Sequence, residues 1–153
     1  RQDLLEEVIG FKVNFVQDNE SKSTKGVLRG LHYQLNPYTQ AKLVRVIEGS
    51  VMDVVVDIRK SSPTFGRYVF KELSAKNKHQ LFIPRGFAHG FMALTDTATF
   101  VYKVDNYYSQ DHERGLFFDD KQLDINWGLP YEILQISEKD IQLPSLDKIE
   151  KLF

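Results

Sequence analysis

Cysteine is absent from this chain of 153 residues. Its absence excludes disulfides, thiolate metal sites and cysteine nucleophiles, and we expect a cytoplasmic location. An excess of positive charge is lacking too, because 20 Lys and Arg residues stand against 21 Asp and Glu residues, for a formal net charge of −1. Without a basic stripe to follow a phosphate backbone, we expect no nucleic-acid partner.

Long hydrophobic runs are also missing. No apolar stretch approaches the roughly 20 residues of a membrane span, and no signal-peptide pattern opens the sequence, so we expect no membrane partner. The composition is 42% hydrophobic and 27% charged, which is typical of a globular protein. The length suffices for one domain with its own core, and we predict a single domain over residues 1–153.

Short segments with strand character dominate the chain. A helix is predicted over residues 2–9, and the runs that follow are rich in β-branched and aromatic residues, with turn residues between them. The predicted strands are residues 11–17, 27–34, 42–47, 51–58, 68–73, 80–83 and 97–104. Regular short strands between turns indicate an all-β sandwich or barrel. Strand 51–58 is apolar on both faces, so its second face is expected to meet another sheet or a subunit.

Two of the four histidines indicate a site. His79 and His112 lie in polar, turn-like surroundings and are predicted at the surface. His32 and His89 follow glycines and hydrophobic residues in or near predicted strands. Each alone is typical of a core histidine with a satisfied hydrogen bond, whereas the two together favour a functional site.

The strand around His32 has an unusual pattern of two glycines. Strict alternation would place four residues on one face, namely Leu28, Gly30, His32 and Gln34. Glycines cost strand stability and are tolerated mainly where a backbone or a ligand approaches closely. The segment is therefore predicted to be shaped for access as well as for packing.

The segment from Pro84 to His89 is a reason to consider a metal site, because it has the Pro-x-Gly-x-x-His form of the second cupin motif. A metal-binding cupin also needs His-x-His and a nearby Glu, but Gln34 stands two residues after His32 and residues 37–39 add no carboxylate. We therefore predict no metal. The remaining alternative is a weak site built from the two histidines and a stray carboxylate.

Three polar residues in predicted strands have both a structural and a chemical interpretation. Lys42 is either a lysine at a strand end that extends to water or a buried cation that stabilises an oxyanion beside His32. Asp53 lies in an apolar strand and needs a partner, and it could orient that lysine. Tyr102 is either a core tyrosine with one hydrogen bond or an acid.

Ordered motifs across nearly the whole chain resemble those of one family. They are Gly26–Gln34, Gln40–Val46, Asp57–Arg59, Ser62–Gly66, Ile83–Phe91, Tyr102-Lys103, Asn106–Tyr108, Trp127 and Ile136–Asp140. Together they are similar to dTDP-4-dehydrorhamnose 3,5-epimerases, which are metal-independent cupins. The resemblance implies a double-stranded β-helix (the cupin jelly roll) with a few short peripheral helices. It also implies a homodimer and no cofactor.

The resemblance also implies roles for single residues. His32 is expected to be the general base, Asp140 its orienting carboxylate, Tyr102 the acid on the opposite face of the sugar, and Lys42 the group beside the C4 oxygen. By itself, Asp140 also fits a helix start of the form Ser-x-x-Asp. Family positions that bind substrate fall on Arg29, Asp53, His89, Arg59 and Tyr108, and Gln17 and Asn19 match the family segment that contacts the dTDP moiety.

The implied reaction converts dTDP-4-dehydro-6-deoxy-D-glucose to dTDP-4-dehydro-L-rhamnose by inverting C3 and C5. Both carbons flank the C4 ketone, so loss of either proton gives an enolate. The alternatives are an epimerase acting at one carbon, a keto-isomerase of another dTDP-deoxysugar pathway, and a non-catalytic cupin that binds nucleotide sugars. Family members also carry an Asp-x-Arg-Gly-x-Phe-x-Glu segment upstream of the helix in which this sequence begins, and the Arg and Phe of that segment help to bind the nucleotide.

Overall fold

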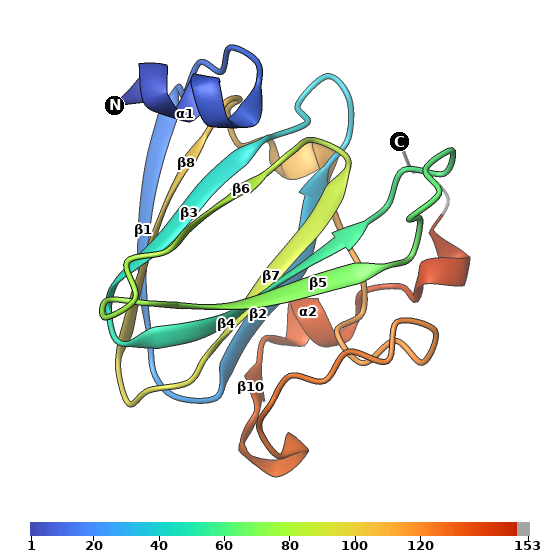
Figure 1. Cartoon of the computed structure of the whole chain (residues 1–153). Coiled ribbons are helices and arrows are strands. Elements are labelled where there is room, and N and C mark those ends of the chain that lie inside the picture. The colour runs from blue at the N-terminus through green and yellow to red at the C-terminus, as the bar shows by residue number, and fades with distance from the viewer. Residues whose placement is uncertain (150–153) are drawn as a thin grey trace.

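Two sheets face each other in the computed structural model, which describes residues 1–149. Figure 1 shows the sheets as the two walls of a barrel. The first sheet has the order β1 (Gln17–Ser23), β8 (Ala98–Val104), β3 (Lys42–Glu48), β6 (Gln80–Ile83). The second has the order β10 (Gln135–Ile136), β2 (Val27–Gln34), β7 (Phe87–Ala93), β4 (Ser50–Asp57), β5 (Tyr68–Ser74), with β9 (Glu113–Gly115) also paired to β2.

The path of the chain makes this a jelly roll. From β1 to β4 each strand lies in the sheet opposite the one before it, and after β5 the alternation resumes through β6, β7 and β8. The described pairings are antiparallel except that of β10 with β2. The predicted all-β double-stranded β-helix is confirmed.

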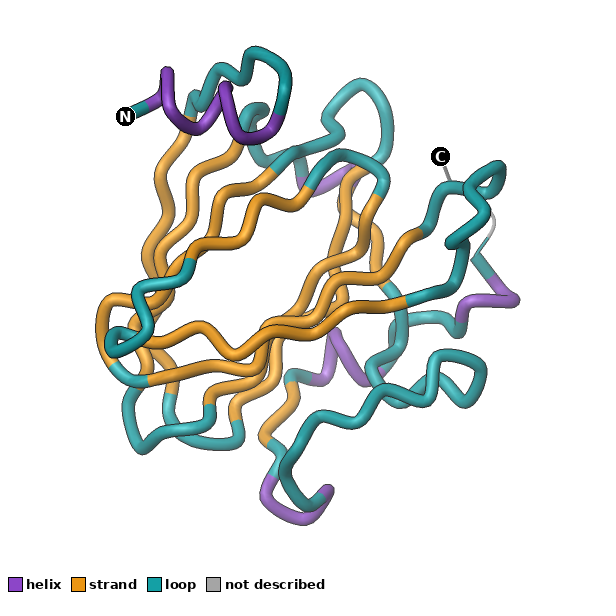
Figure 2. Tube along the Cα trace, viewed as in Figure 1, coloured by secondary structure: helices purple, strands orange, loops and turns teal. Residues whose placement is uncertain are grey.

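Short helices lie outside the barrel, as Figure 2 shows in purple. They are α1 (Gln2–Ile9), α2 (Glu138–Ile141) and three 3-10 turns at Gln110–His112, Tyr131–Ile133 and Leu146–Lys148. Helix α1 ends at Gly10, whose φ of 82° suits glycine and whose N–H donates to the Glu6 carbonyl. No helix within residues 1–149 is long and apolar enough to cross a bilayer.

Strand β4 of the second sheet is buried on both faces. Val51 and Val55 of β4 point between the sheets, into a cluster built around Phe91 and Phe100. Val54 and Val56 point outward into another cluster, which the segment after β8 covers. The covering residues are Leu116, Phe118, Leu123, Trp127 and Leu146. The strand is apolar on both faces, as predicted, but the cover is the chain's own segment rather than a further sheet or a subunit.

The expected strand at residues 11–17 is wrong. Residues 11–16 form no strand, and β1 begins at Gln17 and continues to Ser23. The sequence of β1 is entirely polar, so hydrophobic alternation gives no signal there. Seven register pairs with β8 hold the strand through backbone hydrogen bonds. The predicted strands also omit the short strands β9 and β10 and the central strand β7, whose hydrophobic run is interrupted by His89 and Gly90.

Close backbone contact explains the glycines of β2. Gly30 has a φ of 116°, and a Cβ on it would lie 2.7 Å from the Cα of Gly90 in β7. The register between β2 and β7 shifts between Arg29 and His32, so the strict alternation predicted for this strand does not hold. Leu28 belongs to the outer cluster together with Leu31, whereas Arg29 and His32 both line the interior cavity.

Candidate active site

A cavity of about 410 Å³ opens between the two sheets, and a second of about 290 Å³ shares three residues with it. The shared residues are His32 from β2, Lys42 from β3 and Tyr102 from β8. The histidine therefore enters from one sheet and the lysine and tyrosine from the other. Asp140 also lines the larger cavity, so the structure brings together all four predicted catalytic residues.

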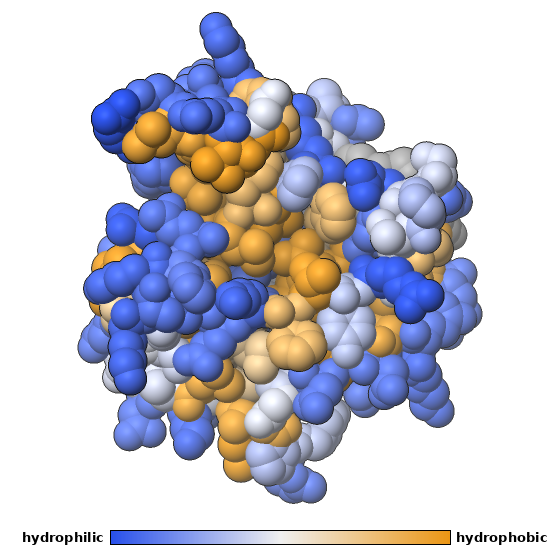
Figure 3. Space-filling view, viewed as in Figure 1, coloured by the Kyte–Doolittle hydropathy of each residue, from blue (hydrophilic) through white to orange (hydrophobic). Residues whose placement is uncertain are grey.

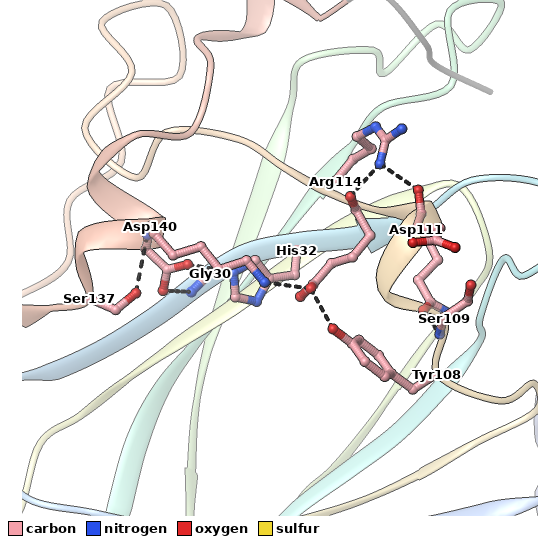
Figure 4. A network of polar contacts seen from close by, with 11 residues as sticks. Gly30, His32, Tyr108, Ser109, Asp111, Arg114, Ser137 and Asp140 are labelled. Carbon is pink, nitrogen blue, oxygen red and sulfur yellow. Dashed lines mark hydrogen bonds and ion pairs between the residues drawn. The ribbon is translucent and has the colours of Figure 1, made fainter.

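His32 and Asp140 form a hydrogen-bonded pair (Figure 4). Nε2 of His32 lies 2.6 Å from Oδ1 of Asp140, and the other carboxylate oxygen accepts the Gly30 N–H at 3.2 Å. Burial works against ionisation of Asp140, but the hydrogen bond and charge of His32 outweigh it and hold the pKa of this carboxyl below its usual value. A carboxylate can only accept. His32 therefore carries a proton on Nε2, which in the neutral ring leaves the lone pair on Nδ1.

Both sequence interpretations of Asp140 apply at once. The Asp140 N–H donates to the Ser137 hydroxyl at 3.1 Å, so Ser137 caps α2. The Asp140 carboxylate does not return to the cap, because its two oxygens serve His32 and Gly30. The cap fixes the backbone that presents the carboxylate to the histidine.

The wall opposite His32 combines a buried cation with a neutral phenol. Burial lowers the pKa of Lys42 from 10.5 to about 8, although the charges of Asp53 and Glu113 oppose the shift. Burial raises the pKa of Tyr102, and the nearby charge of Arg29 partly offsets it. At neutral pH the site therefore holds an ammonium, which can stabilise an anion, and a protonated phenol, which can donate a proton.

Asp53 on β4 and His89 on β7 form a second pair, in the same sheet as His32. Asp53 is fully buried, and its Oδ2 lies 2.9 Å from Nε2 of His89. Burial lowers the pKa of His89, although Asp53 opposes the shift. His89 lines the larger cavity, whereas Asp53 lines neither cavity of the site. Asp53 thus reaches a ligand only through His89 or through its charge.

The smaller cavity contains the residues predicted to bind the nucleotide. Gln17 and Asn19 point into it from β1, joined by a 2.7 Å hydrogen bond between their side chains. Tyr108 lines it from the loop after β8. The side chain of Gln34 holds that loop in place, because it donates to the Tyr107 carbonyl and accepts the Ser109 N–H.

A family model described as dTDP-4-dehydrorhamnose 3,5-epimerase matches residues 1–148. The chain belongs to the dTDP-4-dehydrorhamnose 3,5-epimerase family. Members of this family are isomerases. The match extends over the barrel, the two cavities and α2.

Relatives and solved structures agree with this assignment. The epimerase of Shigella flexneri is 61% identical over 140 residues, which are 92% of this chain and 76% of that protein. A Legionella pneumophila 3,5-epimerase in complex with dTDP-4-keto-L-rhamnose superposes with a TM-score of 0.94 at 49% identity, covering 98% of this chain and 79% of that one. A 3'-monoepimerase from Streptomyces bikiniensis, in complex with dTDP-quinovose, gives 0.88 at 33% identity and covers 96% and 74%.

Arg59, like Asp53, is a predicted substrate-binding residue that lines neither cavity of the epimerase-family site. Its guanidinium makes two hydrogen bonds with the Asp57 carboxylate, at 2.9 and 2.7 Å, and lies 4.6 Å from the centre of the Phe87 ring. The Arg59 pair lowers the pKa of Asp57 well below its usual range. This carboxylate and ring hold the guanidinium away from the two cavities of the site.

Two residues of the site were missed at the level of sequence. Glu113 of β9 accepts hydrogen bonds from the Tyr108 hydroxyl and from the Lys139 ammonium, and together they connect the loop after β8 to α2. Burial raises the pKa of Glu113, but Lys139 and Tyr108 reverse the shift and keep it ionised. Lys139 is part of the family motif Ile136–Asp140 and could have been found there, whereas nothing local distinguishes Glu113.

His112, expected at the surface, is half-buried against Tyr38.

The described residues also bear on the metal alternative. Among residues 1–149, no three His, Asp or Glu side chains gather closely enough to hold an ion. Gln34, at the second ligand position of metal-binding cupins, uses its amide to hold the loop instead, since it also donates to the Tyr38 carbonyl at 2.7 Å.

Replacing Asp140 with Asn tests the role of the carboxylate. The amide can donate to Nε2 of His32, which would move the imidazole proton to Nδ1 and block it as a base. We expect kcat to fall by about 10²- to 10⁴-fold with a much smaller change in KM. Glu138→Gln, which changes an exposed carboxylate of the same helix, should leave both constants unchanged. Equal kinetics for the two variants would contradict the assignment.

Proposed function

We propose that the protein is a 3,5-epimerase that converts dTDP-4-dehydro-6-deoxy-D-glucose to dTDP-4-dehydro-L-rhamnose, a step of dTDP-rhamnose synthesis. One observation carries the proposal. A histidine oriented by a carboxylate faces a lysine and a tyrosine from the opposite sheet across one cavity. Inversion next to a ketone needs groups on opposite sides of the carbon, because the histidine removes a proton from one face and the tyrosine supplies a proton from the other.

The steps follow from the protonation states of these groups. Nδ1 of His32 removes the proton from C5 or C3, and the electron pair moves through the new C–C double bond to the C4 oxygen. Lys42 stabilises the enolate that forms, as a preorganised cation does at an oxyanion. Tyr102 then gives its proton to the carbon from the other face. The imidazolium and phenolate that remain return to their starting states by proton exchange with solvent.

The two adjoining cavities support a nucleotide sugar as substrate. The sugar would occupy the larger cavity, where the four proposed catalytic residues meet. The dTDP moiety would extend into the smaller cavity, whose wall carries Gln17, Asn19 and Tyr108. Arg29 is exposed at the larger cavity and would meet the diphosphate, because a guanidinium suits phosphate oxygens.

The proposal is tested with dTDP-4-dehydro-6-deoxy-D-glucose in deuterated water, followed by NMR. We expect deuterium at both C3 and C5 and formation of the L-rhamno product, without added metal and in the presence of a chelator. Exchange and inversion at one carbon would identify a one-carbon epimerase, as in the Streptomyces bikiniensis relative. Tight binding without exchange would identify a non-catalytic cupin that binds nucleotide sugars. Loss of activity with the chelator would indicate a metal.

We also propose that two copies of the chain pair as a homodimer, in which α1 takes part. Leu4 and Val8 of this helix are exposed to 50% and 84%, beside a groove of about 620 Å³ that Leu43 and Phe82 also line. Figure 3 shows hydrophobic side chains gathered beneath this helix. Exposed apolar patches of this kind are typical of interaction surfaces. A molar mass in solution twice the 17.8 kDa of the chain would support pairing, and the mass of one chain would contradict it.

A further inference from the structure

The inner face of β1 is polar where the wall of a barrel is usually apolar. Its side chains alternate between inward and outward positions, and the four inward ones are Gln17, Asn19, Ser21 and Ser23. On the neighbouring strand β8, the residues directly opposite them are Val104, Tyr102, Phe100 and Ala98. A row of polar groups therefore runs along the interior from the smaller cavity toward the larger one.

The four polar side chains of this row differ in their hydrogen bonds. Gln17 and Asn19 bond to each other at 2.7 Å. The hydroxyls of Ser21 and Ser23 are both buried, and neither has a hydrogen-bond partner among the described residues. A buried hydroxyl without a partner costs free energy, so each needs an explanation.

Access to the cavity separates the two serines. Ser21 lines the larger cavity, in register with Phe100, which lines it too. Ser23 lies two residues further along the same face and lines neither of the two cavities of the site. Ser21 therefore borders the space in which a ligand would lie, and a turn about χ1 would bring its buried hydroxyl to that ligand, whereas Ser23 has neither cavity of the site beside it.

The chemistry of the cavity indicates what Ser21 would bind. A hydroxyl offers one donor and two acceptor positions, which match another neutral hydroxyl better than they match a phosphate or an ammonium. With the C4 ketone beside Lys42 and the reacting carbons between His32 and Tyr102, the hydroxyl groups that remain on the ring are those at C2 and C3, since the ring oxygen and the C1 oxygen carry no proton. The C6 methyl group has nothing to bond.

We propose that Ser21 is a specificity-determining residue whose Oγ hydrogen-bonds one ring hydroxyl of the sugar, at C2 or at C3. The proposal rests on the proposed function, because it places the sugar in the larger cavity. In the absence of that hydroxyl, Ser21 would be left buried without a partner, and such a mismatch is a strong basis for rejecting a deoxygenated sugar.

The experiment compares three substrates with three proteins. The substrates are dTDP-4-dehydro-6-deoxy-D-glucose and its analogues that lack the C2 or the C3 hydroxyl. Deuterium incorporation at C5, which all three possess, gives kcat/KM on one scale. We expect the wild-type protein to disfavour one analogue by about tenfold, as the loss of a hydrogen bond to a buried group implies. The analogue that is disfavoured identifies the hydroxyl.

The serine variants decide the assignment. Ser21→Ala should lower kcat/KM for the parent sugar to the level of the disfavoured analogue and reduce the discrimination to within about twofold. Ser21→Cys, which preserves the shape but bonds weakly, should behave similarly and covers the case in which Ser21→Ala fails to fold. Ser23→Ala should retain the wild-type discrimination, because Ser23 has the same buried hydroxyl without access to the cavity.

The failure of this inference can be distinguished from the failure of the proposed function. Wild-type protein that exchanges deuterium into the parent sugar but discriminates against neither analogue overturns the role of Ser21 alone. Full discrimination retained in Ser21→Ala does the same. Wild-type protein that exchanges no deuterium into the parent sugar overturns the proposed function, and the inference falls with it.

Discussion

Replacing His32 with Asn is expected to remove deuterium incorporation at C3 and at C5 together, with kcat lower by about 10²- to 10⁴-fold. The reason is geometric. His32 is the one imidazole of the larger cavity whose Nε2 is held by an ionised carboxylate that also bonds the backbone of Gly30. Asn can still accept or donate a hydrogen bond there, but it has no basic nitrogen.

Two comparison variants make the His32 result specific. His79→Asn changes an exposed histidine and should retain full activity. Tyr102→Phe should retain proton removal by His32, so deuterium would still exchange into the starting sugar while the inverted product falls sharply. Substantial exchange at either carbon in His32→Asn would show that another group is the base. An unchanged product mixture in Tyr102→Phe would contradict its role as the opposite acid.

Replacing Lys42 with Met is expected to lower kcat by about 10²- to 10³-fold, which is typical for loss of one group that stabilises an oxyanion. The methionine preserves most of the side-chain volume and removes the charge. Because the pKa of Lys42 is about 8, wild-type kcat should also fall as the pH rises past about 8, when the ammonium loses its proton. Lys103→Met, at an exposed lysine one residue after Tyr102, should change neither kcat nor the pH profile.

The same substitution should act on stability in the opposite direction. Burial depresses the folded-state pKa of Lys42 below its ordinary 10.5, so the charged amine disfavours the folded state at pH values below about 8. This destabilisation of the folded state decreases between about pH 8 and 10.5, because Lys42 loses its proton first in the folded state and then in the unfolded state. Lys42→Met should therefore melt at a higher temperature than wild type at pH 7, and the gain should shrink toward pH 10.5. A lower melting temperature at pH 7 would contradict the burial of the charge.

The predictable parts of the fold are those with a local signal. Helix α1 follows from helical spacing, and most strands follow from β-branched and aromatic runs. Strand β1 could not be found this way, because its residues are polar on both faces and its stability comes from the backbone of β8. The break in the alternation of β2 depends on the approach of Gly90 from another strand, which no local pattern records.

The site divides in a similar way. Alternation made interior positions possible for Lys42 and Tyr102, and both residues line the larger cavity. The contact of His32 with Asp140 spans 108 residues and could be expected only through the family resemblance. Glu113 has no local signal, and its position depends on the pairing of β9 with β2. Arg59 shows the opposite case, in which a motif position is kept but the side chain is held by its neighbour Asp57.

The segment that covers the second sheet has a consequence for when the site becomes complete. Leu116, Phe118 and Trp127 seal the outer core, and the same stretch of chain continues through β10 into α2, which carries Asp140. During synthesis the barrel strands that present His32, Lys42 and Tyr102 emerge before this carboxylate does. A chain released before α2 would contain the histidine, the lysine and the tyrosine but would lack the carboxylate that sets the histidine tautomer. Under the proposed mechanism, catalytic competence would be acquired only when the outer layer has docked, so activity would report on completion of the fold.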